Sequence, residues 1–202
     1  MPPLEISARA AASTGYPSPR LRGEGPAPAC DPESDGPIWR DGGFHADAWV
    51  AAADSVALPD VPVILTKAQW LAQREGLQDR RAPLGLRLEP GESIDGIATD
   101  LERFALIALS FPKFSDGRAF STARLLREKH GYRGELRAVG NVLADQIPFM
   151  RRVGFDSYEV SNRPTRLALV EGRIADVTLH YQPAGRAEPS AGTRPWLRRT
   201  PT

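Results

Sequence analysis

The chain has 202 residues, of which 41% are hydrophobic, so it is long and apolar enough for one domain with a buried core. Lys and Arg number 26 and Asp and Glu 25, and this balance gives no reason to expect nucleic acid or an anionic membrane as partner. The only cysteine, Cys30, excludes an internal disulfide and an iron–sulfur cluster, and the three histidines are too far apart in sequence for a zinc motif, so we expect no metal site.

The predicted domain lies between two tails. Residues 1–37 hold eight of the 19 prolines and show neither a helical nor a strand period, so we predict a disordered N-terminal extension. Residues 183–202 are rich in Pro, Gly and Arg, and a disordered tail is expected there too. This leaves a single α/β domain over residues 38–182. There is no run of eighteen apolar residues and no signal-peptide pattern, which predicts a cytoplasmic protein.

A small hairpin is predicted at the start of the domain. Residues 38–40 precede the turn signal Asp41-Gly42-Gly43, and an aromatic residue follows it. We interpret Trp39, Phe44 and Trp49 as packing residues of this region rather than as a platform for stacking a ligand.

From Val61 onward, short apolar runs alternate with helical patterns at a spacing of roughly 20 to 25 residues, which is typical of βα units. We therefore predict a mostly parallel sheet in which consecutive strands are neighbours, like part of a TIM barrel. A flavodoxin-like open sheet is the alternative. Strands are predicted at residues 63–65, 84–88, 106–109, 135–139, 155–160 and 177–181.

Helix starts follow from capping residues. Thr66 to Gln69 reads as a capping box, with Trp70, Leu71 and Leu77 inward, and Ser93 is expected to cap a helix that runs to Phe104. The remaining helices are predicted to start at Ser115 or Asp116, at Ala144 or Asp145 because of Pro148, and at Asn162 before Pro164. The second of these is predicted to bury Phe149. For the end of the domain, a hairpin around Glu171-Gly172 is the alternative to the last helix and strand.

The strongest site candidate follows the 106–109 strand, because ligands of parallel α/β sheets bind at the carboxyl ends of strands. Lys113 and Arg118 bracket a helix start, where free backbone N–H groups favour an anion, and Ser115 adds a hydroxyl donor. These residues predict a site for sulfite, sulfate or a phosphate group. The alternative is that Asp116 caps the helix and pairs with Arg118 or Lys113 in an exposed loop.

Two further strand ends carry polar residues. Asn141, Asp145 and Gln146 follow the 135–139 strand, and their alternative roles are turn former, helix cap and exposed helix residue. Glu159, near the end of the next strand, needs a cationic partner if it is buried, and we expect Lys113 or Arg137 in that role.

Motifs for redox chemistry are absent from the sequence. No GxGxxG follows a predicted strand, and neither GxxxxGK[ST] nor GxSxG occurs. An oxidoreductase needs an electron carrier such as a flavin or nicotinamide, so the cofactor is unknown and the sequence does not decide whether the protein is an enzyme.

One segment, residues 111–160, reads FPKFSDGRAFSTARLLREKHGYRGELRAVGNVLADQIPFMRRVGFDSYEV. It closely resembles the core of the bacterial family known as domain of unknown function 934, and a looser resemblance extends from Trp39 to Ala184. The resemblance implies a role beside assimilatory sulfite reduction, because members are often labelled oxidoreductases of that pathway and are encoded near enzymes that reduce sulfite and adenylyl sulfate. It carries no catalytic residues over to this chain.

Three hypotheses follow. The first is an accessory protein of sulfite reduction that binds an oxyanion or anionic metabolite at Lys113 and Arg118. The second is a TIM-barrel-type enzyme on an anionic small molecule, with Asn141, Asp145 and Glu159 as polar or acid–base groups. The third is a non-catalytic module that docks on sulfite reductase or a neighbouring enzyme of sulfur assimilation. A visible absorption spectrum separates a flavin or haem enzyme from the other two.

Overall fold

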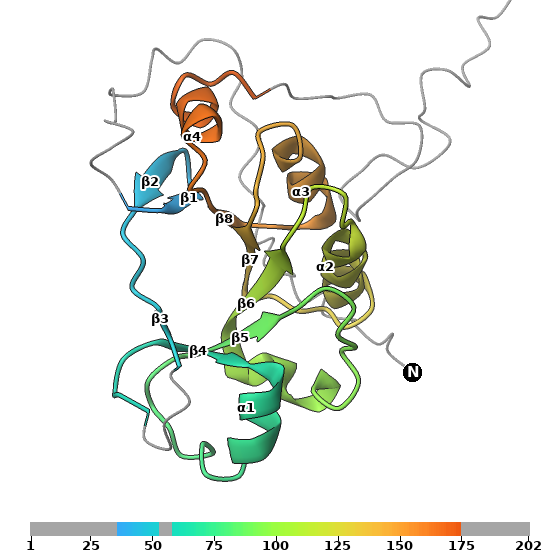
Figure 1. Ribbon diagram of the computed structural model, residues 1–202. Coiled ribbons are helices and arrows are strands. Elements are labelled where there is room, and N and C mark those ends of the chain that lie inside the picture. The colour runs from blue at the N-terminus through green and yellow to red at the C-terminus, as the bar shows by residue number, and fades with distance from the viewer. Residues whose placement is uncertain (1–35, 53–57, 175–202) are drawn as a thin grey trace, which may run out of the picture.

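The computed structural model describes residues 36–52 and 58–174. In that part of the chain, eight strands form one sheet in the order β2-β1-β8-β7-β6-β5-β4-β3 (Figure 1). The strands are β1 (Ile38–Arg40), β2 (Gly43–His45), β3 (Val50–Ala51), β4 (Val63–Thr66), β5 (Leu84–Leu88), β6 (Phe104–Phe111), β7 (Glu135–Gly140) and β8 (Ser157–Glu159). The helices are α1 (Lys67–Gln73), the 3-10 helix η1 (Ala98–Arg103), α2 (Arg118–Glu128), α3 (Ile147–Val153) and α4 (Arg163–Val170).

The sheet is mostly parallel and curls into half a barrel. From β3 to β8, each strand pairs in parallel with the next strand of the chain, so the order never reverses. This confirms the predicted TIM-like partial barrel. A flavodoxin-like open sheet, the alternative, would have a point at which the strand order reverses. The predicted hairpin is also confirmed. Asp41 and Gly42, with φ of 49° and 81°, form its turn, and β1 adds to β8 in antiparallel fashion.

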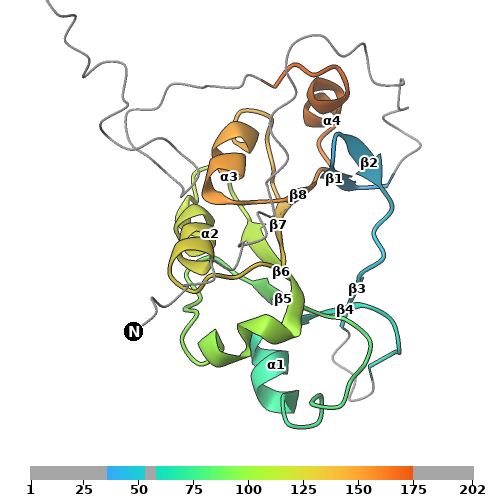
Figure 2. The ribbon, with the colours of Figure 1, turned by 180° about the vertical axis from the view of Figure 1, so that it is seen from behind.

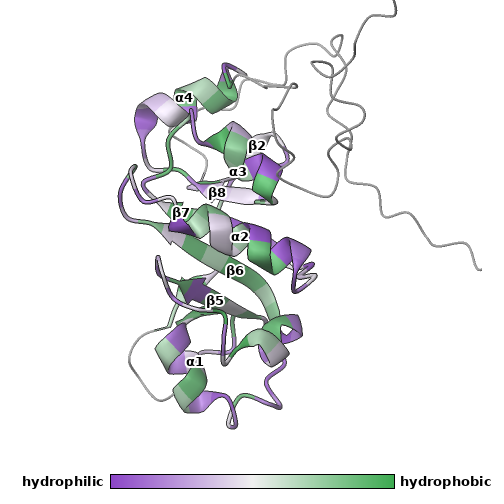
Figure 3. Ribbon diagram, turned by 90° about the vertical axis from the view of Figure 1, so that its right-hand side faces the viewer, coloured by the Kyte–Doolittle hydropathy of each residue, from purple (hydrophilic) through white to green (hydrophobic). Residues whose placement is uncertain are grey.

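The middle of the sheet is β6, which lies between β5 and β7. Ile107 and Leu109 face the helices, Leu106 and Ala108 face the other side, and each is at most 1% exposed. Figure 3 shows β6 hydrophobic along its length, whereas α2 presents both hydrophobic and hydrophilic residues. The apolar run is therefore covered on both faces, as predicted for a central parallel strand.

Helices α1, α2 and α3 lie along one face of the sheet (Figure 2). Arg127, near the end of α2, donates to the backbone carbonyls of Gly134 and Gly154 and to the carboxylate of Asp156 at 2.5 Å. Because these acceptors lie just before β7 and β8, this one side chain ties the helix to both strands.

The opposite face, which we call the inner face, carries the cluster of Leu106, Ala108 and Val139. The segment that connects β2 to β3 joins the two outer strands of the sheet and crosses this face (Figure 1). Its Trp49 packs against the cluster and over Gly85, where an added Cβ would lie 3.1 Å from the indole ring. The half-barrel is therefore filled by a side chain from its own connection. The two-residue strand β3 at its end was not predicted.

The prediction of one helix from Ser93 to Phe104 is wrong. This stretch forms turns followed by η1, and Phe104 already belongs to β6. Gly96 has a φ of 83°, which lies outside a right-handed helix and interrupts it. The apolar period still identified buried positions, which are Ile94, Ile97, Leu101 and Phe104.

The start of α2 also differs from the prediction. Gly117, rather than Ser115 or Asp116, is the N-cap residue and offers no side-chain hydrogen bond. The carboxylate of Asp116 instead accepts a hydrogen bond from the backbone N–H of Arg118 at 3.2 Å. Asp116 therefore stabilises the first turn from one residue outside the cap.

The start of α3 lies further along the chain than predicted. Its N-cap is Gln146, without a side-chain cap bond, rather than Ala144 or Asp145. Pro148 occupies the first turn, and Gly154 ends the helix with a φ of 100°, both as predicted.

Two other helix starts are confirmed. Thr66 and Gln69 form the expected capping box at α1, and Asn162 caps α4 with Pro164 in the first turn. Leu71 was predicted to face inward but is 43% exposed. The predicted strand 177–181, Cys30 and both predicted disordered tails, apart from residues 36 and 37, lie outside the described residues. None of the helices in the described ranges is long and apolar enough to cross a membrane.

Candidate functional site

The carboxyl ends of β5, β6 and β7 lie side by side, and we call the edge formed by the three loops that follow them the rim. The loops after β6 and β7 contact each other. The backbone N–H of Asn141 donates to the carbonyl of Phe111 at 2.7 Å, and Nε2 of Gln146 donates to that of Phe114 at 3.5 Å. Gly140 permits this approach, because its φ is 96° and an added Cβ would lie 2.7 Å from the Phe111 oxygen. Two of the three predicted site segments are thus adjacent.

Arg118, the first residue of α2, is an oriented cation on the rim. Its Nε and Nη2 donate to the two carboxylate oxygens of Asp116 at 3.0 and 2.7 Å. The guanidinium also reaches the loop after β5, where Nη1 would lie 2.7 Å from a Cβ added to Gly91. These hydrogen bonds lower the pKa of the Asp116 carboxyl and raise the pKa of Arg118. Both groups therefore stay charged at neutral pH, while the Arg118 side chain remains 63% exposed.

Lys113 and Ser115 are exposed in the loop that leads to Arg118. The loop is closed by a hydrogen bond from the backbone N–H of Asp116 to the carbonyl of Lys113 at 3.1 Å. Lys113 forms no ion pair with any residue that the structure describes. Of the three predicted anion-binding residues, Lys113 and Ser115 therefore lie in this loop, and Arg118 is the first residue of the helix that follows it. The pairing of Asp116 with Arg118, which the sequence left as an alternative, is present, and anion binding itself stays a prediction.

The secondary candidates divide into exposed and buried residues. Asn141 and Asp145 are exposed in the loop after β7. Gln146 was predicted as an exposed helix residue, but it is only 8% exposed and accepts a hydrogen bond from the backbone N–H of Leu143 at 3.2 Å. Its amide therefore holds the loop together. Within the described ranges, no group of three His, Cys, Asp or Glu side chains is arranged to hold a metal ion.

Glu159 does not have the partner that the sequence led us to expect. Arg137 donates through Nη1 to both oxygens of Asp47, at 2.9 and 3.0 Å, and through Nη2 to Glu135 at 2.9 Å. Lys113 forms no ion pair with it either, within the described residues. The reason is geometric. Glu135 and Arg137 are two residues apart on one strand and share a face, whereas Glu159 lies beyond the registered pairs of β7 and β8.

The polar network of the inner face was missed by sequence reasoning, which named Arg137 only as a partner of Glu159. Arg137 has a side chain only 3% exposed, and Ser157 donates to the same Glu135 carboxylate at 2.5 Å. One strand over from the centre, Nη2 of Arg87 donates to Ser110 at 3.3 Å. A signal was available, because a charged residue at alternate positions of an otherwise apolar strand points away from the helices.

Exposed aromatic residues lie next to the rim. Phe114 is 56% exposed, and Phe149, which was predicted to be buried, is 41% exposed. The ring of Phe149 packs on Phe120 at 4.8 Å, and Phe120 packs on the buried Phe111 at 5.1 Å. A row of rings therefore leads from the core to the surface between α2 and α3.

One comparison with known proteins identifies a family. Residues 85–191 match the model of the family described as bacterial protein of unknown function, DUF934. No curated protein matches the chain. The match covers more than half of the sequence and includes β5 to β8 with the whole rim, so the chain belongs to the DUF934 family.

Proposed function

We propose that this DUF934 protein is a cytoplasmic accessory protein of assimilatory sulfite reduction that binds a small oxyanion or an anionic metabolite at the rim. The link to sulfite reduction rests on the resemblance of residues 111–160. The binding chemistry rests on the rim, where cations and a helix N-terminus lie at the carboxyl ends of central parallel strands, the usual place for ligands in such folds.

One observation carries the proposal: the guanidinium of Arg118 is held in a fixed orientation and yet remains 63% exposed. A guanidinium that binds two carboxylate oxygens of Asp116 has the geometry to bind two oxygens of sulfite, sulfate or phosphate. The ligand exchanges with Asp116 or binds the open side of the pair. Lys113 and the hydroxyl of Ser115, both exposed in the same loop, supply further donors.

Competition with Asp116 predicts the charge of the ligand. Because a carboxylate carries one negative charge, a doubly charged oxyanion displaces it more readily than a singly charged one. We expect an affinity of roughly micromolar to millimolar, about 4 to 8 kcal/mol. Since the site is exposed, binding should weaken as the salt concentration rises.

The test is a calorimetric titration with sulfite, sulfate and adenylyl sulfate. The wild type is compared with the double variant Lys113→Ala, Arg118→Ala, and with a matched control, Arg124→Ala, Lys129→Ala, which removes two cations from the other end of α2. We expect at least one ligand to bind the wild type and the control, and to bind the folded rim variant at least tenfold more weakly. Equal heats in all three proteins would refute the proposal.

A second candidate function, docking on sulfite reductase or a neighbouring enzyme of sulfur assimilation, is favoured by the exposed rings of Phe114 and Phe149. Aromatic residues of this kind are enriched in protein interfaces. The variant Phe114→Ser, Phe149→Ser should lose co-sedimentation with the reductase and keep its affinity for the anion. Leu71→Ser, at an exposed apolar position on α1, is the control. Loss of co-sedimentation in the control variant alone would exclude this surface.

A further inference from the structure

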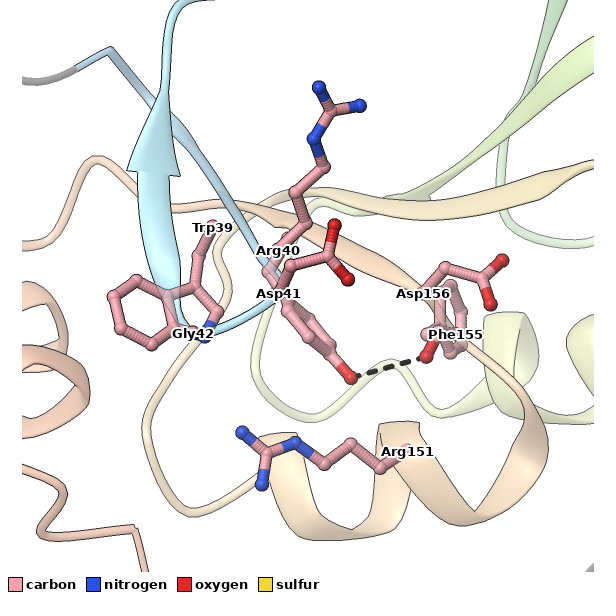
Figure 4. Close-up of a pocket in the computed structure, with 8 residues that line it drawn as sticks. Trp39, Arg40, Asp41, Gly42, Arg151, Phe155 and Asp156 are labelled. Atoms are coloured by element: carbon pink, nitrogen blue, oxygen red, sulfur yellow. Dashed lines mark hydrogen bonds between the residues drawn. The ribbon is translucent and has the colours of Figure 1, made fainter. Parts of the chain in front are cut away.

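A cavity of about 270 Å³ lies between the turn of the β1–β2 hairpin and the segment that leads from α3 into β8 (Figure 4). It opens at the amino end of β8, the edge of the parallel sheet opposite to the rim. Its size is close to the lower limit for small-ligand pockets, roughly 300 Å³. The cavity therefore suits one small molecule and is separate from the site of the proposed function.

The walls of the cavity are aromatic and fixed. Trp39, Phe155 and Tyr158 line it and are 7%, 5% and 3% exposed. Trp39 and Tyr158 are paired across β1 and β8, and the Trp39 ring packs on Phe44 at 4.9 Å. The Tyr158 hydroxyl donates to the carbonyl of Phe155 at 3.3 Å. These contacts hold the walls in place without a ligand, so a flat group would meet a preformed aromatic surface.

Two hydrogen-bond donors of the cavity have no partner among the residues that the structure describes. The indole nitrogen of Trp39 makes no hydrogen bond with the described residues, and since it is not among their buried atoms without a partner, it is accessible to solvent or to a ligand. The guanidinium of Arg151 makes no ion pair in the same part of the chain. In Figure 4 the guanidinium of Arg151 lies below Trp39. Both donors line the same cavity, and neither has an acceptor among the described residues.

Two carboxylates, of Asp41 and Asp156, also line the cavity, but neither pairs with Trp39 or Arg151. Asp156 is bound by Arg127 at 2.5 Å and by the backbone N–H of Leu136 at 2.8 Å, and its carboxylate points away in Figure 4. Asp41 is exposed in the hairpin turn and makes no ion pair with Arg151. The cavity thus combines aromatic walls with two donors that have no partner in the described part of the chain.

We propose that the cavity between the hairpin and β8 is a second ligand site, for a small planar molecule with a carboxylate or another oxyanion group. The anionic group accepts hydrogen bonds from Trp39 Nε1 and Arg151, and the flat part lies against the aromatic wall of Trp39, Phe155 and Tyr158. Charge complementarity selects anions, because Arg151 has no other counter-charge in the described structure.

The test follows the indole N–H resonances of the four tryptophans by NMR while benzoate, benzenesulfonate or benzylamine is added. The variant Trp39→Phe identifies the resonance of Trp39. We expect both anions to shift that resonance saturably with a Kd of roughly one millimolar, and the cation benzylamine to leave it in place. Comparing the two anions distinguishes a carboxylate site from a sulfonate site.

Variants then test the two donors. Arg151→Ala should weaken anion binding about tenfold. Its neighbour Arg152, which stacks on Phe149 at 5.6 Å, provides the matched control Arg152→Ala with unchanged affinity. Arg151→Gln, which keeps a hydrogen-bond donor and loses the charge, serves if the alanine variant does not fold. An unshifted Trp39 resonance, equal affinity for benzylamine, or undiminished binding in both Arg151 variants would overturn the proposal.

Discussion

Asp116 controls how much of Arg118 a ligand can reach. Its carboxylate accepts three hydrogen bonds from Arg118, two from the guanidinium and one from the backbone N–H. The same residue thus orients the cation and competes for it. The affinity for an oxyanion at the rim should therefore rise most when the Asp116 carboxylate no longer competes for Arg118 and the start of α2 stays intact.

The first prediction follows from that competition. Asp116→Asn removes the negative charge and keeps an acceptor for the backbone N–H of Arg118, so sulfate affinity measured by calorimetry should rise about three- to tenfold. Glu128→Gln, which releases Arg124 at the other end of α2, is the control and should leave the affinity unchanged. Weaker binding after Asp116→Asn would mean that the carboxylate acts only by orienting Arg118.

The pKa shifts of the pair predict the pH dependence. The pKa of Asp116 lies below its ordinary value of 3.8 and the pKa of Arg118 lies above its ordinary value, because each is hydrogen-bonded to the other. The stabilising charge of Asp116 is therefore present above about pH 4 and is lost only as the pH falls through its lowered pKa. Sulfate affinity at constant ionic strength should stay flat from about pH 5 to about pH 9. A rise toward pH 5 would show that some other group titrates at the site.

At the scale of elements, the connection between β2 and β3 is held to the inner face by Trp49 and Asp47. Trp49 lies over Gly85, and Asp47 binds the buried Arg137. Two contacts, one apolar and one ionic, thus fix the segment that joins the outer strands of the half-barrel.

The apolar contact is tested by Gly85→Val. An added Cβ already lies 3.1 Å from both Ile64 and Trp49, so the larger valine should displace the indole and lower the free energy of unfolding by about 1–3 kcal/mol in urea titrations. Gly43→Val is the control, because the atom nearest to its added Cβ is 3.8 Å away on a flexible His45 side chain. A similar stability in both variants would show that the inner face is loosely packed.

The ionic contact is tested by Arg137→Met. Removing the buried cation leaves Asp47 and Glu135 without their shared partner, which should cost about 3 kcal/mol of unfolding free energy. Arg87→Met, on the same face but with a side chain 48% exposed, should cost less than about 1 kcal/mol. If Arg137→Met lowered the unfolding free energy by less than about 1 kcal/mol, the network around Arg137 would not be needed for stability.

Elements were predictable from the sequence where a side chain encodes their boundary. Thr66 and Asn162 cap their helices through side-chain oxygens, and both starts were correct. Gly117 and Gln146 cap theirs without such a bond, so stronger capping residues nearby misled the prediction. At Gly96, one positive φ outweighed a helical apolar period.

At the scale of the whole molecule, the half-barrel was predictable because the features that determine it are short segments of neighbouring residues. Each parallel strand is an apolar run, and regular βα spacing fixes the order of neighbours. The pairing of Asp47 with Arg137 spans 90 residues and leaves no local signal. The same holds for the cavity that joins Trp39 to Arg151, since only the antiparallel addition of β1 to β8 brings them together.

The rim was predictable in part. That the loops after β6 and β7 would be adjacent follows from strand order and the position of ligands in parallel sheets. Whether Asp116 would pair with Arg118 did not follow, because Lys113, on the other side of Asp116 in the same loop, was also within reach in sequence. The exposed ring of Phe149 was missed, since a helical period does not show which end of an apolar face reaches the surface.

The most direct test of anion binding at the rim is an NMR titration of the isotope-labelled protein with sulfate, following every backbone amide. The account predicts saturable shifts at residues 113–118, with smaller ones at Gly91 across the Arg118 guanidinium, all with one Kd. Those shifts should disappear in the Lys113→Ala, Arg118→Ala variant. Shifts that map elsewhere, or that persist unchanged in this variant, would contradict the account.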